Sequence, residues 1–158
     1  MDIALSKHVT PEDLQACLSA LLPRRVVHIF QDMADDPWPA FDVAVSIYHN
    51  PSEFPCGLSV LVALIDEAGT AAWLRELARQ LSIKFACHVI CDGSEFGDDN
   101  SPFWSIVWDA GDAYLADDCN TIFADGEGGP VKIMRRLPTL ETSARPVDLA
   151  ISVQSRFK

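Results

Sequence analysis

Residues 41 to 65, FDVAVSIYHNPSEFPCGLSVLVALI, decide the fold class because they contain two strand patterns with no helix between them. In residues 41–48 the apolar side chains alternate, and one face of this strand carries Phe41, Val43, Val45 and Ile47. Residues 57–65 form a continuous apolar run, which is typical of a central strand covered on both sides. Residues 26–30, VVHIF, predict a short strand just before this region. Three strands that follow one another without helices predict a mainly antiparallel sheet.

A helix pattern lies on each side of these three strands. Thr10 caps the first helix, Pro11 takes its first position and Pro23 ends it. The apolar stripe of this helix consists of Leu14, Cys17, Leu18, Leu21 and Leu22. Thr70 caps the second helix, residues 71–81, whose stripe consists of Trp73, Leu74, Leu77, Ala78 and Leu81. Because each helix has one apolar stripe, we expect both to pack on one face of the sheet.

Three further strands are expected in the second half of the chain. Residues 83–91, IKFACHVIC, alternate, and one face carries Ile83, Phe85, Cys87, Val89 and Cys91. Residues 103–108 and 113–117 predict two strands of a hairpin, joined by the turn Asp109-Ala110-Gly111-Asp112. The predicted fold is therefore α+β, with a mainly antiparallel sheet of about six strands and two helices packed on one face.

The 158 residues are expected to form one domain with an extension. Residues 1–130 make up the α+β domain, and residues 131–158 make up a C-terminal extension that is partly irregular. Within this extension, residues 131–137 and 147–153 have strand character and could add a strand to the same domain.

The sequence predicts a cytoplasmic protein without membrane association. Its longest apolar run is far shorter than the about 20 residues that a membrane helix needs. Asp2 stands where a signal peptide carries positive charge. The five cysteines are an odd number without a disulfide-framework spacing, which indicates reduced thiols.

Negative charge is distributed unevenly along the chain. The formal net charge is −11, and residues 85–131 contain ten acidic residues but no Lys or Arg. A field of this sign repels phosphates and anionic lipids, so direct nucleic-acid binding is not expected. Residues 132–158 are basic, with six Lys and Arg against two acidic residues. This basic tail either pairs with the protein's own acidic surface or stays mobile.

No catalytic, metal or cofactor site is predicted. The acidic stretch does not match a calcium-binding loop, and Cys87 and Cys91 lack the second pair of ligands that a zinc site needs. A phosphate-binding loop and a nucleophile elbow are also missing from the sequence. His49 lies at a strand end before Asn50-Pro51, which is an open position, and His88 lies within a strand. One alternative is therefore a small enzyme or ligand-binding domain with a pocket near His49 or His88.

Aromatic residues accompany the carboxylates between residues 91 and 120. Trp104 and Trp108 project from the same face of their strand and either cover the core or form an outward aromatic strip bordered by acids. Aromatic anchors ringed by charge are typical of tight protein interfaces. The predicted partner-binding residues are Trp38, Asp92, Glu95, Asp98, Asp99, Trp104, Trp108, Asp109, Asp112, Asp117 and Asp118. A further alternative is a structural protein that self-associates through Trp104 and Trp108.

A small, strongly acidic α+β chain with patches of carboxylates and aromatic residues resembles the immunity proteins of bacterial contact-dependent and polymorphic toxin systems. The resemblance lies in overall character and not in a motif, so it assigns no residue. It implies a partner with a basic domain, a toxin and often a nuclease. We therefore expect an immunity or inhibitor protein that occludes the active site of this domain with its acidic 92–118 region, using carboxylates and tryptophans.

Overall fold

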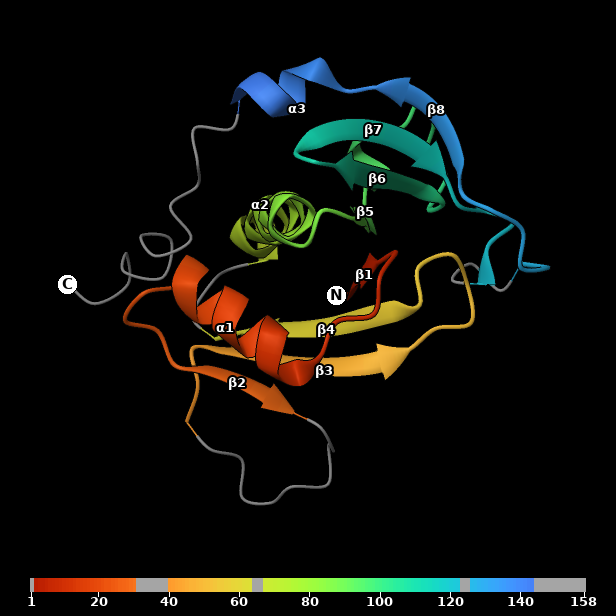
Figure 1. Cartoon of the computed structure of the whole chain (residues 1–158). Coiled ribbons are helices and arrows are strands. Elements are labelled where there is room, and N and C mark those ends of the chain that lie inside the picture. Colours follow the sequence, from red (N-terminus) through yellow and green to blue (C-terminus); the bar gives the residue numbers. More distant parts are fainter. Residues whose placement is uncertain (1, 31–39, 64–66, 123–125, 144–158) are drawn as a thin grey trace.

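One mixed sheet of eight strands organises the chain (Figure 1). The computed structural model describes residues 2–30, 40–63, 67–122 and 126–143. The strands are β1 Asp2–Leu5, β2 Val27–Phe30, β3 Val43–His49, β4 Cys56–Val62, β5 His88–Asp92, β6 Trp104–Asp109, β7 Asp112–Asp117 and β8 Lys132–Arg136. The helices are α1 Pro11–Leu21, α2 Glu67–Phe85, α3 Pro138–Ser143 and a short 3-10 helix, η1 Ser94–Phe96. None of the described helices is both long enough and apolar enough to cross a membrane.

The α+β class is confirmed, and the sheet is larger than expected. Its order is β2-β3-β4-β1-β5-β6-β7-β8, with the N-terminal strand β1 in the middle. β2 and β3 are parallel, and all the other neighbours are antiparallel. Within the described residues the sheet therefore has eight strands and not about six, and three α-helices accompany it and not two. The added strands are β1, which the sequence analysis missed, and β8, which comes from the extension.

The main core lies between the helices and one face of the sheet. Both predicted helix stripes face this core, with Leu14 and Leu18 of α1 and Trp73 and Leu77 of α2 buried in it. Alternate strand residues, among them Leu5, Leu58 and Ile106, meet them from the sheet. We call the opposite face, on which no described α-helix packs, the open face.

The expectation that residues 57–65 are covered on both sides is wrong. Leu58 and Val60 of β4 face the helices, but Ser59 and Leu61 point to the open face, where Leu61 is 51% exposed. A continuous apolar run does not by itself reveal whether the second face of a strand is covered. The described α-helices lie on one side of this sheet, and the open face carries the hollows described below.

The strand predicted over residues 83–91 is also shorter than expected. α2 begins at Glu67, before Thr70, and continues to Phe85, so that Ile83 and Phe85 are helical and only His88–Asp92 is a strand. The helix ends at Ala86, which has a positive φ of 47°. This left-handed conformation is usually supplied by glycine, and an alanine gave no visible stop signal in the sequence.

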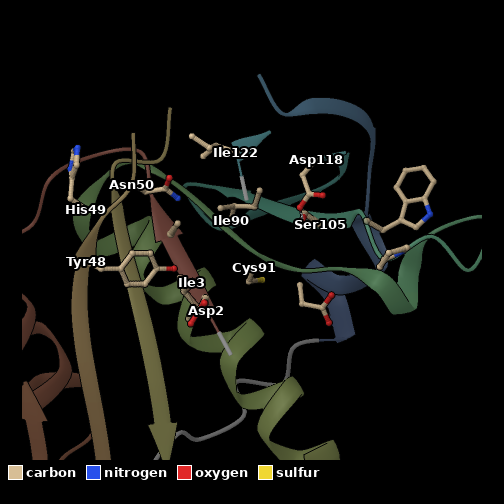
Figure 2. A pocket seen from close by; sticks show the side chains of 14 residues that line it. Asp2, Ile3, Tyr48, His49, Asn50, Ile90, Cys91, Ser105, Asp118 and Ile122 are labelled. Carbon is tan, nitrogen blue, oxygen red and sulfur yellow. Dashed lines mark hydrogen bonds between the residues drawn. The ribbon is translucent and has the colours of Figure 1, made fainter. Parts of the chain in front are cut away.

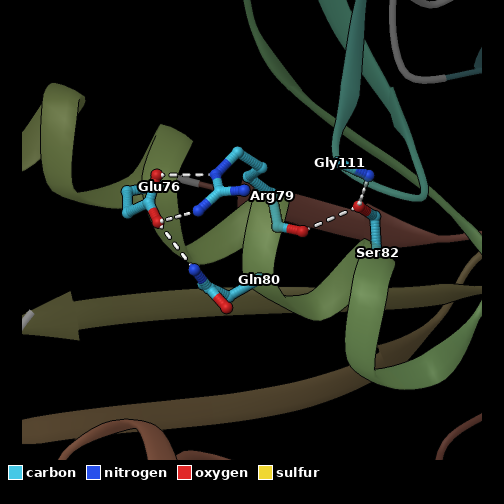
Figure 3. A network of polar contacts seen from close by, with 5 residues as sticks. All are labelled: Glu76, Arg79, Gln80, Ser82 and Gly111. Carbon is cyan, nitrogen blue, oxygen red and sulfur yellow. Dashed lines mark hydrogen bonds and ion pairs between the residues drawn. The ribbon is translucent and has the colours of Figure 1, made fainter. Parts of the chain in front are cut away.

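The predicted hairpin is confirmed and is fixed to α2 by hydrogen bonds. Ala110 and Gly111 both have positive φ, as a two-residue type I′ turn requires. The Gly111 N–H donates to Ser82 Oγ at 3.1 Å, and Ser82 Oγ donates to the Arg79 carbonyl at 2.7 Å (Figure 3). Glu76 in turn accepts hydrogen bonds from the Arg79 guanidinium. The last turns of α2 therefore hold the hairpin turn in place.

Replacing Ser82 with alanine is expected to lower the free energy of unfolding by about 1 to 3 kcal/mol. The buried hydroxyl accepts from the turn and donates to the helix, and its loss leaves the Gly111 N–H without this partner. Urea denaturation measures the change, and the exposed Ser59→Ala on β4 is the control. Equal stability of the two variants would contradict this role of Ser82.

Candidate functional site

Part of the predicted acidic surface is paired with the chain's own arginines. Arg135 and Arg136 of the exposed edge strand β8 lie 3.2 Å from Asp98 Oδ1 and 3.1 Å from Asp112 Oδ1. Glu95 pairs in the same way with Arg75 of α2, at 3.2 Å. Of the two alternatives for the basic tail, pairing with the protein's own acidic surface is therefore confirmed for Arg135 and Arg136, and a basic partner cannot meet the whole 92–118 region as bare charge.

The two strand tryptophans do not form an outward strip. Trp108 is 2% exposed and lies in the main core with Ile106, so its assignment to a partner surface is wrong. Trp104 is half-buried against the same core, and its indole N–H donates to Asp99 Oδ1 at 2.7 Å. The helices cover this face of β6, which explains the burial. Trp38 lies outside the described residues, as does the strand predicted over residues 147–153.

The remaining predicted carboxylates lie in three places. Asp109 Oδ2 is 3.6 Å from His88 Nε2, and Asp117 Oδ1 accepts a hydrogen bond from the Cys119 N–H. Asp92 and Asp118 line a pocket. Neither Asp92 nor Asp118 forms an ion pair with a Lys or Arg in the described part of the chain.

This pocket, which we call the acidic pocket, lies over the open face of β1, β5 and β6 and has a volume of about 490 Å³. Asp118 and Ser105 lie on one side, Tyr48, His49 and Asn50 lie on the other, and Ile90 lies between them (Figure 2). Asp2 adds a third carboxylate, and no Lys or Arg contributes to the lining among the residues that the structure describes. Small open-face side chains such as Ala4 and Ser105 leave room for the hollow.

One side of the acidic pocket depends on Tyr48, which pairs with Gly57 across β3 and β4. A Cβ atom on Gly57 would come within 2.2 Å of the Tyr48 ring, so only glycine lets the ring lie across β4. Burial, the charge of Asp2 and a hydrogen bond to Asp2 raise the pKa of Tyr48 to about 12. Tyr48 is therefore a neutral phenol at physiological pH, and its hydroxyl hydrogen-bonds the Asp2 carboxylate.

The other side carries the Asp92 and Asp118 carboxylates. Asp92 is opposite Ser105 in the β5–β6 register, and the Ser105 hydroxyl donates to Asp118 Oδ2. The Ser94 N–H and hydroxyl both donate to Asp92 at 3.2 Å. Burial raises the pKa of Asp118, the Ser105 hydrogen bond lowers it, and the charges of Asp117 and Asp92 raise it further. Negative charge is thus concentrated here, and no Lys or Arg among the described residues forms an ion pair with either carboxylate.

Replacing Asp118 with asparagine is expected to raise the unfolding temperature at pH 7. Because the pKa of Asp118 is raised on folding, the carboxylate destabilises the folded state above that pKa. The stability of the native protein recovers as pH falls through the raised value toward the pKa of an unfolded aspartate, about 3.9. The gain from the variant should therefore vanish at lower pH.

Thermal unfolding at pH 7 and below pH 4 measures this difference. Glu127→Gln, which removes the same charge from an exposed loop, is the control. A destabilised Asp118→Asn at pH 7 would show that the carboxylate serves the fold and not a site.

A second, smaller hollow lies beside His88, also on the open face. Its volume is about 330 Å³, and its lining includes Glu53, His88, Asp109 and Tyr114. Buried Phe54, from the loop between β3 and β4, packs on Ile90 and Val107 in a second small core on this face. The two histidines singled out in the sequence therefore line different hollows, His49 the acidic pocket and His88 the second one.

The acidic pocket combines groups that are chemically suited to an organic cation. Carboxylates supply charge, and Tyr48, Asn50 and Ser105 supply hydrogen-bonding groups. Among the described residues, no three His, Cys, Asp or Glu side chains are arranged to hold a metal ion. Sequence reasoning missed Asp2, Tyr48 and Asn50, and the open strand-end position of His49 was the one signal that pointed toward them. Comparisons with protein-family models, curated proteins and solved structures find no match.

Proposed function

We propose that the protein is an immunity or inhibitor protein that neutralises a basic toxin domain by binding it over the acidic pocket. The observation that carries the proposal is that Asp92 and Asp118 line a hollow to which no Lys or Arg among the described residues contributes, with the Tyr48-bonded Asp2 beside them. In a chain of net charge −11, this grouping attracts a basic domain and accelerates its encounter.

The open face around the pocket supplies the apolar part of such an interface. Tyr48, Leu61 and Ile122 are large apolar or aromatic residues that remain exposed there or at the pocket. An apolar surface around a few desolvated polar groups is the usual composition of a protein interface. Bound in this way, the carboxylates take the place of a polyanionic substrate, such as a nucleic acid, in the active site of the toxin. We place this activity in the cytoplasm.

The experiment is capture of the tagged protein from the cell that encodes it, at low and at high salt. We expect a partner with a strongly basic domain that is lost at high salt. Expressed alone, this domain should be toxic, and co-expression with the protein should restore growth. An acidic partner, or toxicity that co-expression leaves unchanged, would overturn the proposal.

The second candidate is a small enzyme or ligand-binding domain. It is favoured by the pocket volume of about 490 Å³, which lies within the range of small-molecule sites, and by the position of His49 in the lining. In that case His49→Ala should abolish binding or turnover of a small cationic compound. An unchanged growth rescue by the same variant would favour the immunity function.

A further inference from the structure

We infer that the acidic pocket receives an arginine side chain, with its guanidinium group between Asp92 and Asp118 and its backbone beside Asn50. This inference rests on the proposed function in one respect, because it takes the occupant from a basic protein partner. It adds the type of residue that the partner inserts and the direction in which that residue enters.

Asn50 gives the first reason to expect a bound group. Its side chain is only 7% exposed and lines the acidic pocket, and Figure 2 shows the carboxamide projecting from the end of β3 toward the middle of the pocket. The carboxamide makes no hydrogen bond with any described residue, although the Asn50 backbone bonds Pro55 and Ser52. A carboxamide can both donate to and accept from a peptide group, so Asn50 offers a matching pair of hydrogen-bonding groups to a bound chain.

The opposite end of the pocket gives the second reason. Asp92 and Asp118 flank Ser105, and both carboxylates line the hollow without an ion pair to any described Lys or Arg. A cation placed between them removes the mutual repulsion that accompanies the raised pKa of Asp118. Carboxylates that bind a charged donor form hydrogen bonds about twice as strong as those between neutral groups.

A guanidinium group fits this end better than an ammonium group. Its five donors lie in a plane and can bond two neighbouring carboxylates at once, whereas a lysine presents a compact charge that holds its water more strongly. A pocket of about 490 Å³ also has room for the long arginine side chain between Asn50 and Asp118.

The test is a titration of the isotopically labelled full chain with Nα-acetyl-L-arginine methylamide, followed by amide chemical shifts. We expect shifts that map to Asn50, Asp92, Ser105 and Asp118, and binding at least about tenfold tighter than that of the matching lysine derivative. Equal or tighter binding of the lysine derivative would overturn the guanidinium assignment. No saturable shifts, or shifts that map outside the pocket, would overturn the site.

Variants separate the two ends of the pocket. Asp92→Asn should weaken binding of both the arginine derivative and free guanidinium by about tenfold, and Asp118→Asn should do the same. Asn50→Ala should weaken binding of the arginine derivative but leave binding of free guanidinium unchanged. Glu12→Gln, on exposed α1 surface, should change neither. An Asn50→Ala variant that binds the derivative like the native protein would overturn the proposed direction of entry.

The outcome is independent of growth rescue. If co-expression neutralises a toxin but the arginine derivative does not bind, the immunity function stands and the arginine receptor fails. If the derivative binds in the pocket but no basic toxin is captured, the receptor stands and the immunity function fails.

Discussion

Replacing Trp73 with alanine is expected to lower the free energy of unfolding by about 3 to 5 kcal/mol. Trp73 is fully buried in the main core, at the N-terminal end of the apolar stripe of α2. Its removal loses the transfer free energy of a large side chain and leaves a cavity that the surrounding helix and sheet cannot fill completely. Denaturation in guanidinium chloride, followed by far-ultraviolet circular dichroism, measures the change.

The control is Leu61→Ala on the open face, which should cost about 1 kcal/mol or less because that side chain is 51% exposed. Equal stability of the Trp73→Ala and Leu61→Ala variants would contradict the packing of α2 on the sheet. The result also bears on the site, because α2 contacts β1, β5 and β6, the strands that carry Asp2, Asp92 and Ser105. Loosening this helix should therefore also weaken binding in the pocket.

Local patterns were sufficient to predict much of this fold. The stripe of α1 follows from spacings of three and four residues, and the β6–β7 hairpin follows from a two-residue turn that contains Gly111. These features involve residues that are close in sequence, so the local sequence pattern is enough to predict them. The end of α2 was missed because Ala86 adopts a conformation that sequence analysis assigns to glycine.

Features that depend on distant contacts could not be predicted in the same way. β1 has four residues, and its position between β4 and β5 depends on pairing with strands more than fifty residues away. The acidic pocket needs this placement, because it brings Asp2 beside Tyr48 and near β5. For the same reason, Asp92 and Asp118 could be predicted as site residues from their charge, but the hollow that they share could not be predicted.

Pairing of charges is equally non-local. The sequence left two alternatives for the basic tail, and the structure places Arg135 and Arg136 against Asp98 and Asp112. The tail thus neutralises one part of the acidic surface and leaves the part around the pocket without such partners among the described residues. This difference between two groups of carboxylates allows a comparison in which the net charge is held constant.

Reversing both pocket charges, Asp92→Lys with Asp118→Lys, is expected to slow association with the basic partner by about 100-fold at low salt. The matched variant, Asp98→Lys with Asp112→Lys, changes the net charge of the chain equally. It should slow association much less, because Arg135 and Arg136 already offset those two carboxylates. Stopped-flow mixing of the purified proteins over a range of salt concentrations gives both rate constants.

The salt dependence and the dissociation rate distinguish steering from contact. Carboxylates that act only through the general field should alter the association rate and leave dissociation unchanged, whereas carboxylates buried against a cation should also speed dissociation. We expect the Asp92→Lys, Asp118→Lys variant to associate more slowly and to dissociate faster. We expect the Asp98→Lys, Asp112→Lys variant to associate slightly more slowly and to dissociate at an unchanged rate. Each variant is first checked for native unfolding behaviour in urea. If two folded variants of equal net charge slowed association equally, the partner would be responding to total charge, and the pocket would have no special part in binding.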